Sequence, residues 1–188
     1  VLNRVSGNFD NMAYQIEEHI KAVVNLFHYT LINGDATTTA STDHPEFQGL
    51  DSMLAGTTTE YGTDKAIDLS SITAIKSNAD EFYEALSLLV KTTDADAVLT
   101  NTEMITKIQT VARILGYKTE SEEAFGKRVT TIDGVKLVDM QDYYTVSSGA
   151  ATAGHVVKKG LSRTIAKESS ATTGLTDVYA VKFDVNDG

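Results

Sequence analysis

The chain has 188 residues, of which 41% are hydrophobic and 22% charged, proportions typical of one large or two small soluble globular domains. Its 16 basic and 26 acidic side chains give a net charge of −10, which disfavours direct nucleic-acid binding because that binding depends on lysine and arginine neutralising phosphates. Cysteine is absent, which excludes disulfides and thiolate chemistry. No apolar run is long enough to cross a membrane, and no signal peptide is recognisable.

A long amphipathic helix is predicted over residues 11–35. Its hydrophobic residues recur every three or four positions and form one stripe: Met12, Ile16, Ile20, Val23, Val24, Phe27 and Leu31. The expected N-cap is Asn8, Asp10 or Asn11, and Asn33-Gly34 marks the end because glycine readily adopts left-handed dihedral angles. Residues 1–10 lack this periodicity and are predicted to be extended.

Residues 34–63 are rich in threonine, serine, glycine and aspartate, and they contain the chain's one proline, Pro45. This composition predicts a long loop. We expect Phe47, Leu50 and Leu54 to pin it to the rest of the domain, because loops of this length are usually pinned, functional or disordered.

Two further helices are predicted, with a buried strand between them. The first covers residues 71–91, with Asp68 or Ser70 as its N-cap. A short apolar run at 97–100 predicts a central strand, and the pair Asn101-Thr102 predicts the N-cap of a helix over 103–115 that ends at Gly116. A strand followed by a helix indicates an α/β unit.

The segment 128–138 predicts a β-hairpin, because two β-rich arms flank Asp133-Gly134, a pair that accepts the positive φ angles of a two-residue turn. Residues 147–154 are small and are predicted to form a loop. Alternating apolar residues within 177–185 predict a closing strand.

No catalytic, cofactor-binding or metal site is predicted, so the sequence does not indicate an enzyme. The four histidines have no metal-site spacing: His19, His28, His44 and His155. His19 and His28 fall on the polar side of the first helix, where we expect them to be solvated. Gly149 and Gly154 have the spacing of a phosphate-binding loop, but His155 replaces the required lysine. The acidic pairs and clusters are interpreted as solvated loops: Asp94, Asp96, Glu120, Glu122 and Glu123.

One local exception to the acidic composition lies at residues 143–167, which contain no acid. Lys158, Lys159, Arg163 and Lys167 fall close together there. We interpret the segment as a solvated loop or a contact between subunits rather than a nucleic-acid patch.

Four blocks of the chain together resemble one family. Residues 27–35 (FHYTLINGD), followed by 47–50 (FQGL), resemble the F…INGDG…F.GL stretch of tailed-bacteriophage major capsid proteins of the Hong Kong ninety-seven type. Residues 96–101 (DAVLTN), the hairpin at 125–138 and the strand at 176–183 (TDVYAVKF) are similar to later blocks of that family, in the same order. Two departures are Ala36, where the family has a second glycine, and Leu137, where a proline is frequent.

The resemblance implies an α+β capsid fold with a long spine helix. Residues 1–67 would supply the spine helix and part of the peripheral domain, and residues 68–188 the axial domain with a central mixed sheet flanked by helices. The chain would be the core of such a protein, without its N-terminal arm, extended loop and C-terminal return. It would have no active site or cofactor.

The implied function is structural. Copies would assemble into hexamers and pentamers of an icosahedral phage or prophage head that encloses double-stranded DNA without binding it specifically. Scaffold, portal or decoration proteins would be further partners. The protein would be located in the virion, after assembly in the host bacterial cytoplasm.

Three other hypotheses remain open. The first is an encapsulin-type nanocompartment, which shares the fold but encloses an enzyme cargo. The second is a small α/β enzyme with an acidic pocket that gathers Asp94, Asp96 or the glutamates near Glu120. The third is a bacterial surface or adhesion module, suggested by the threonine-rich loops, although helices and a strand–helix unit argue against it.

Overall fold

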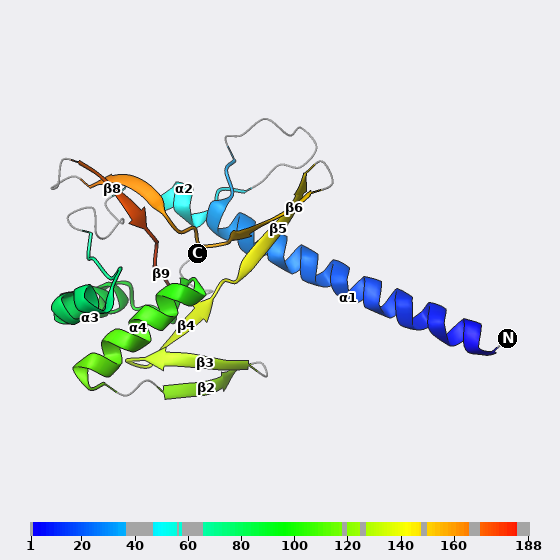
Figure 1. Ribbon diagram of the computed structural model, residues 1–188, viewed down its shortest axis with the longest axis horizontal. Helices are drawn as coiled ribbons and strands as arrows, with labels where there is room; N and C mark the ends of the chain where they lie inside the picture. The colour runs from blue at the N-terminus through cyan, green and yellow to red at the C-terminus, as the bar shows by residue number, and fades with distance from the viewer. Residues whose placement is uncertain are drawn as a thin grey trace. The chain divides into compact units, whose positions relative to one another are not determined.

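The computed structural model describes residues 2–36, 47–55, 57, 66–117, 120–124, 127–147, 150–165 and 170–183. The chain combines helices with sheet and divides into two compact units (Figure 1). One unit contains residues 1–57 and 142–156, and the other contains residues 58–141 and 157–188. The first unit therefore joins the amino-terminal part of the chain to a segment from far along the sequence.

The first unit is built on helix α1, Leu2–Asn33, followed by the short helix α2, Leu50–Leu54. The predicted end of α1 is confirmed. The predicted extended stretch at 1–10 is wrong from Leu2 onward, and so are the three candidate N-caps, which lie inside the helix. Asparagine and aspartate within a helix cost only about 0.7 kcal/mol each relative to alanine, so they do not stop one.

A two-stranded ribbon completes this unit, with β5, Asp142–Ser147, antiparallel to β6, Ala150–His155. The loop predicted at 147–154 is therefore wrong over most of its length. Pairing with β5 overrides the weak strand preference of the alanines, because strand preference depends strongly on context. A Cβ on Gly154 would lie 2.6 Å from the Tyr143 ring, so glycine makes room for that ring.

The loop predicted at 34–63 is only partly described. Residues 37–46, 56 and 58–65, with Pro45 and His44, lie outside the described residues. Residues 50–54 are helical rather than loop, and the expected pinning residues are present: Leu50 and Leu54 are half-buried, and the Phe47 ring lies 6.2 Å from that of Phe27.

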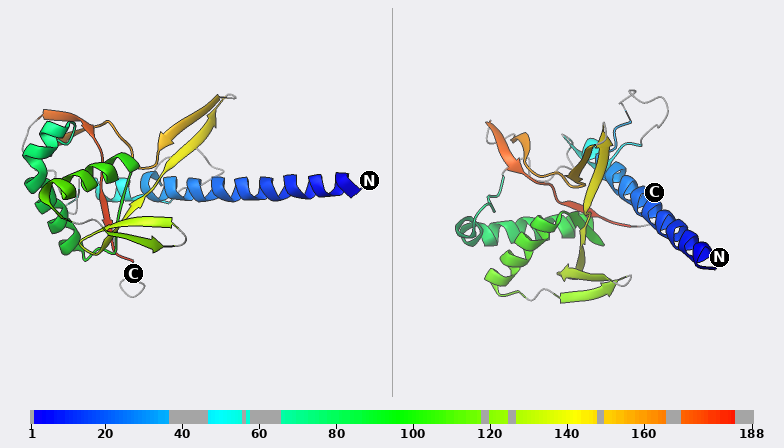
Figure 2. Two further views of the ribbon diagram at one scale, coloured as in Figure 1. Left: turned by 60° about the horizontal axis from the view of Figure 1, so that its bottom comes forward. Right: turned by 45° about the vertical axis from the view of Figure 1, so that its right-hand side comes forward.

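The second unit contains a five-stranded sheet in the order β2-β3-β4-β1-β9, in which β1 and β4 are parallel and the other neighbours antiparallel. The strands are β1, Ala97–Thr100; β2, Glu120–Ala124; β3, Lys127–Ile132; β4, Val135–Asp139; and β9, Tyr179–Val181. Helices α3, Ile72–Thr93, and α4, Thr102–Leu115, pack against each other and share one core with the sheet. A separate hairpin pairs β7, Leu161–Ile165, with β8, Ser170–Leu175 (Figure 2).

Local signals for turns and caps in this unit match the structure at both ends of α4 and at the β3–β4 turn, but not at the start of α3. Asn101 caps α4, Gly116 ends it with φ 79°, and Asp133-Gly134 turns the β3–β4 hairpin with φ 50° and 81°. The cap of α3 is Ser71 rather than Asp68 or Ser70, because the Ser71 hydroxyl accepts a hydrogen bond from the Ala74 amide.

Two other expectations about this unit need correction. The glutamates at 120–123 lie in edge strand β2 rather than in a loop, because they pair with β3, as in the register Glu123↔Arg128. The closing strand is shorter than predicted and covers Tyr179–Val181. Residues 184–188 lie outside the described part of the chain.

Candidate functional site: the apolar face of helix α1

The predicted apolar stripe of α1 is largely exposed. Met12, Ile16, Ile20, Val23, Val24 and Phe27 expose between 43% and 66% of their surface. Tyr14 and Leu26 are exposed as well. Monomeric soluble proteins rarely expose contiguous apolar patches larger than a few hundred Å², and larger ones usually mark interaction sites. We call the six exposed residues of the stripe, which are all of its members except Leu31, the α1 face.

Charged side chains on the polar side of α1 form ion pairs within the helix. Lys21 lies 3.0 Å from carboxylate oxygens of both Glu17 and Glu18, and these hydrogen bonds raise the pKa of Lys21 above its ordinary value. His19 is exposed, as predicted. Among the described helices, none has the length and hydropathy needed to cross a membrane. Residues 11–24 are exposed on every side of the helix, so the α1 face is the apolar side of an uncovered helix.

The end of α1 forms a close-packed corner with α2. The Gly34 amide donates to the Thr30 carbonyl at 2.8 Å, and the Gly49 amide donates to the Gly34 carbonyl at 2.8 Å. The Ser52 hydroxyl also donates to the Gly34 carbonyl, at 3.2 Å. A Cβ on Gly49 would lie 2.5 Å from the Gly34 nitrogen, a distance that only glycine avoids. The two segments INGD and FQGL thus meet through their glycines.

The last turn of α1 is also fixed to the β5–β6 ribbon. The Asn33 side chain donates to the Val156 carbonyl at 2.7 Å, and the rings of Tyr29 and Tyr143 lie 4.3 Å apart. His28 is half-buried, and its Nδ1 atom is buried without a hydrogen-bond partner in the described part of the chain. The prediction that His28 is solvated is therefore wrong, because the helix continues into packed structure at this turn.

The acidic residues considered for chemistry do not gather at one place. Asp94 is the C-cap of α3 and pairs with Lys182 at 3.0 Å. The Asp96 carboxylate accepts a hydrogen bond from the Phe183 amide at 2.8 Å, beside edge strand β9. The glutamates of β2 lie at the opposite edge of the sheet. His155 pairs with Asp142 at the base of the ribbon, in the other unit. Within the described residues, no group of three or more metal-ligating side chains occurs.

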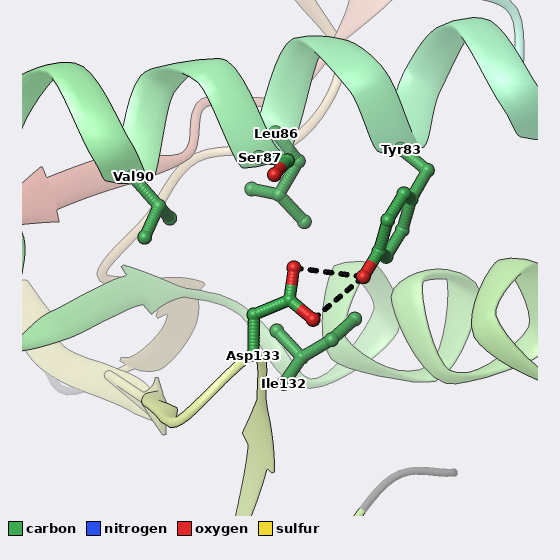
Figure 3. Close-up of a pocket in the computed structure, with 6 residues that line it drawn as sticks. All are labelled: Tyr83, Leu86, Ser87, Val90, Ile132 and Asp133. Carbon is green, nitrogen blue, oxygen red and sulfur yellow. Dashed lines mark hydrogen bonds between the residues drawn. The ribbon is translucent and has the colours of Figure 1, made fainter. Parts of the chain in front are cut away.

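A small pocket in the second unit lies between α3 and the β3–β4 turn, lined by Tyr83, Leu86, Ser87, Val90, Ile132 and Asp133 (Figure 3). It encloses about 10 Å³, which is room for one water molecule at most. The Tyr83 hydroxyl donates to the Asp133 carboxylate at 2.7 Å, and the Tyr83 and Tyr117 rings stack at 4.5 Å. Burial and this hydrogen bond raise the pKa of Tyr83. The arrangement joins α3 to the hairpin turn and leaves no space for a substrate.

Among the described residues, the feature that points to a function is therefore the exposed apolar α1 face rather than the small pocket beside Tyr83. Sequence spacing identified its residues but not their exposure. In comparisons with known proteins, no family model, no curated protein and no solved structure matched this chain.

Proposed function

We propose that this chain is a structural protein that assembles with copies of itself into a shell. The specific form we propose is a major capsid protein of the Hong Kong ninety-seven type, which forms hexamers and pentamers of a phage head. The observation that carries the proposal is the α1 face, because six large apolar side chains at 43–66% exposure are costly to leave in water.

The charge of the chain agrees with this proposal. A net charge of −10 repels DNA phosphates, so a wall made of such copies would contain DNA without gripping it. A face that meets a different surface of the next copy makes a heterologous contact, and such contacts close into rings when the rotation allows.

The glycine corner supports the family resemblance on physical grounds. Gly34 and Gly49 stand in the two segments that resemble the capsid family, and each would clash with backbone atoms if it carried a Cβ. The resemblance in that stretch therefore falls on residues that the local packing requires.

The test is the mass of the full chain in solution, measured by light scattering over a wide concentration range and followed by negative-stain microscopy. We expect rings or closed shells. The double variant Ile16→Ser/Ile20→Ser should shift the protein to monomer, because it removes apolar area from the centre of the α1 face.

The matched control is Leu88→Ser on α3, which removes an apolar side chain of similar exposure, 48%, outside the α1 face. It should leave assembly unchanged. A monomeric wild type at every concentration, or equal loss of assembly in both variants, would overturn the proposal. In purified shells, the ratio of absorbance at 260 and 280 nm would then separate a DNA-filled head from a compartment with protein cargo.

A further inference from the structure

The β7–β8 hairpin of the second unit is flanked by two short roots, residues 157–160 before β7 and residues 176–178 after β8. Among the described elements, β7 and β8 make their extensive contacts with each other. Hydrogen bonds at the roots therefore bear on the direction of the hairpin.

Asn101, at the end of β1, reaches both roots. It is 2% exposed, and its Nδ2 atom donates to the Thr176 hydroxyl at 2.8 Å and more weakly to the Val157 carbonyl at 3.4 Å. Its Oδ1 atom separately accepts from the Met104 amide at 2.9 Å and so caps α4. One side chain thus has two roles on two different atoms.

Neighbouring groups extend the connection. The Thr176 hydroxyl, which accepts from Asn101, donates to the Lys158 carbonyl at 2.9 Å and so ties the two roots to each other. Thr100, which is fully buried, donates to the Asp177 carbonyl at 3.0 Å. Hydrogen bonds in such a chain polarise one another and are costly to break when buried.

We propose that Asn101 is a positioning residue whose carboxamide nitrogen holds the β7–β8 hairpin in one direction, independently of its role as the cap of α4. Without the nitrogen, Thr176 and Lys158 would still keep the two roots together, but the hairpin would be less firmly attached to β1. A fixed direction would matter for any contact between the hairpin and a neighbouring copy. Only this role in contacts between copies rests on the proposed function.

The informative variant is Asn101→Ser, because serine is a good N-cap but is too short to reach Thr176. The matched control is Asn78→Ser, which removes another asparagine donor of the same unit, the bond from Asn78 to the Asp68 carbonyl at 2.9 Å, without touching the hairpin. The chain has no cysteine, so two spin labels can be placed on Thr106→Cys in α4 and Thr173→Cys in β8, both exposed positions.

The measurement is the distribution of distances between the two labels by pulsed electron paramagnetic resonance. We expect a single narrow distribution in the parent and in Asn78→Ser, and one about twofold wider in Asn101→Ser. Equal widths in all three would overturn the proposal, whether or not the protein assembles. The far-ultraviolet circular dichroism of Asn101→Ser should stay helical, which separates hairpin motion from loss of α4.

If Asn101→Ser fails to fold, a second pair of variants tests the same bond from the other side. Thr176→Val removes the hydroxyl and should widen the distribution, whereas Thr176→Ser keeps the hydroxyl and should restore the parent width. A narrow distribution in Thr176→Val would contradict the proposal.

Discussion

Helices α1 and α4 have the same kind of sequence and opposite surroundings. Both repeat apolar residues every three or four positions, yet Ile108 of α4 is fully buried while Ile20 of α1 is 59% exposed. α4 packs on α3 and the sheet within the second unit, whereas only the last turns of α1 have such neighbours in the first unit. Apolar periodicity therefore predicts that a helix needs cover, and it does not say whether the cover comes from the same chain.

The two helices also end differently. α4 ends on Gly116, which has φ 79° and nothing within 4 Å of where a Cβ would lie, so glycine is needed there for its dihedral angle. α1 ends in the corner where Gly34 meets Gly49. Gly49 has an extended φ of −82°, which any residue can adopt, so glycine is needed there for close approach. The same residue type thus serves conformation in one helix end and packing in the other.

The largest expected effect tests the contrast in burial. Ile108→Ala should lower the free energy of unfolding by about 2–5 kcal/mol, because it leaves a cavity in the core. Ile20→Ala should change it by about 0.5 kcal/mol or less, because the side chain is already mostly in water. Urea unfolding at low protein concentration measures both values. A loss above about 2 kcal/mol for Ile20→Ala in a dilute monomer would show that the chain covers its own α1 face.

A second prediction sharpens the contrast between the helix ends. Gly49→Ala should cost about 3 kcal/mol, because its Cβ would meet backbone atoms of Ile32 and Gly34 that cannot move independently. Gly116→Ala should cost about 1 kcal/mol, the penalty of a left-handed conformation for a residue with a Cβ.

Asparagine at each position separates the two causes. Gly116→Asn should recover part of the loss, since asparagine tolerates the left-handed region, whereas Gly49→Asn should be at least as harmful as Gly49→Ala. Thermal unfolding of the four variants ranks them. Similar losses at both positions would contradict the distinction between conformation and packing.

The sequence predicted several features that depend on a few adjacent residues, although it missed the start of α1 and the Ser71 cap of α3. The cap at Asn101, the end at Gly116 and the turn at Asp133 carry their physical cause in their own side chains or dihedral angles. Features that depend on a distant partner were missed. Strand β6 forms because β5 is available to pair with it, and Tyr83 contacts Asp133 across 50 residues of sequence.

The candidate site shows the same limit. Spacing identified the residues of the α1 face, but exposure depends on which elements pack nearby. The corner of Gly34 and Gly49 was not predicted, because nothing in either segment alone specifies that the Gly49 amide meets the Gly34 carbonyl.

The smallest expected effect concerns charge on the two helices. Lys21 of α1 has partners within its own helix, whereas Glu103 of α4 accepts a hydrogen bond from Lys159 of the hairpin root at 2.8 Å. This bond, with the charges of Lys159 and Lys107, lowers the pKa of Glu103. A lowered pKa in the folded state means that the pair stabilises the protein above the ordinary glutamate pKa and that this stabilisation is lost as the pH falls through the lower value.

Stability of the wild type should therefore decline in acid slightly more steeply than that of Glu103→Gln. The difference should be about 0.5 kcal/mol or less, because the Glu103 side chain is 53% exposed and solvent screens the pair. Urea midpoints between pH 3 and pH 6 measure it. Since an exposed pair weakens in salt, 1 M NaCl should remove the difference. A difference that persists in salt would mean that the hydrogen bond between Lys159 and Glu103, rather than the screened attraction between separated charges, carries the pH dependence.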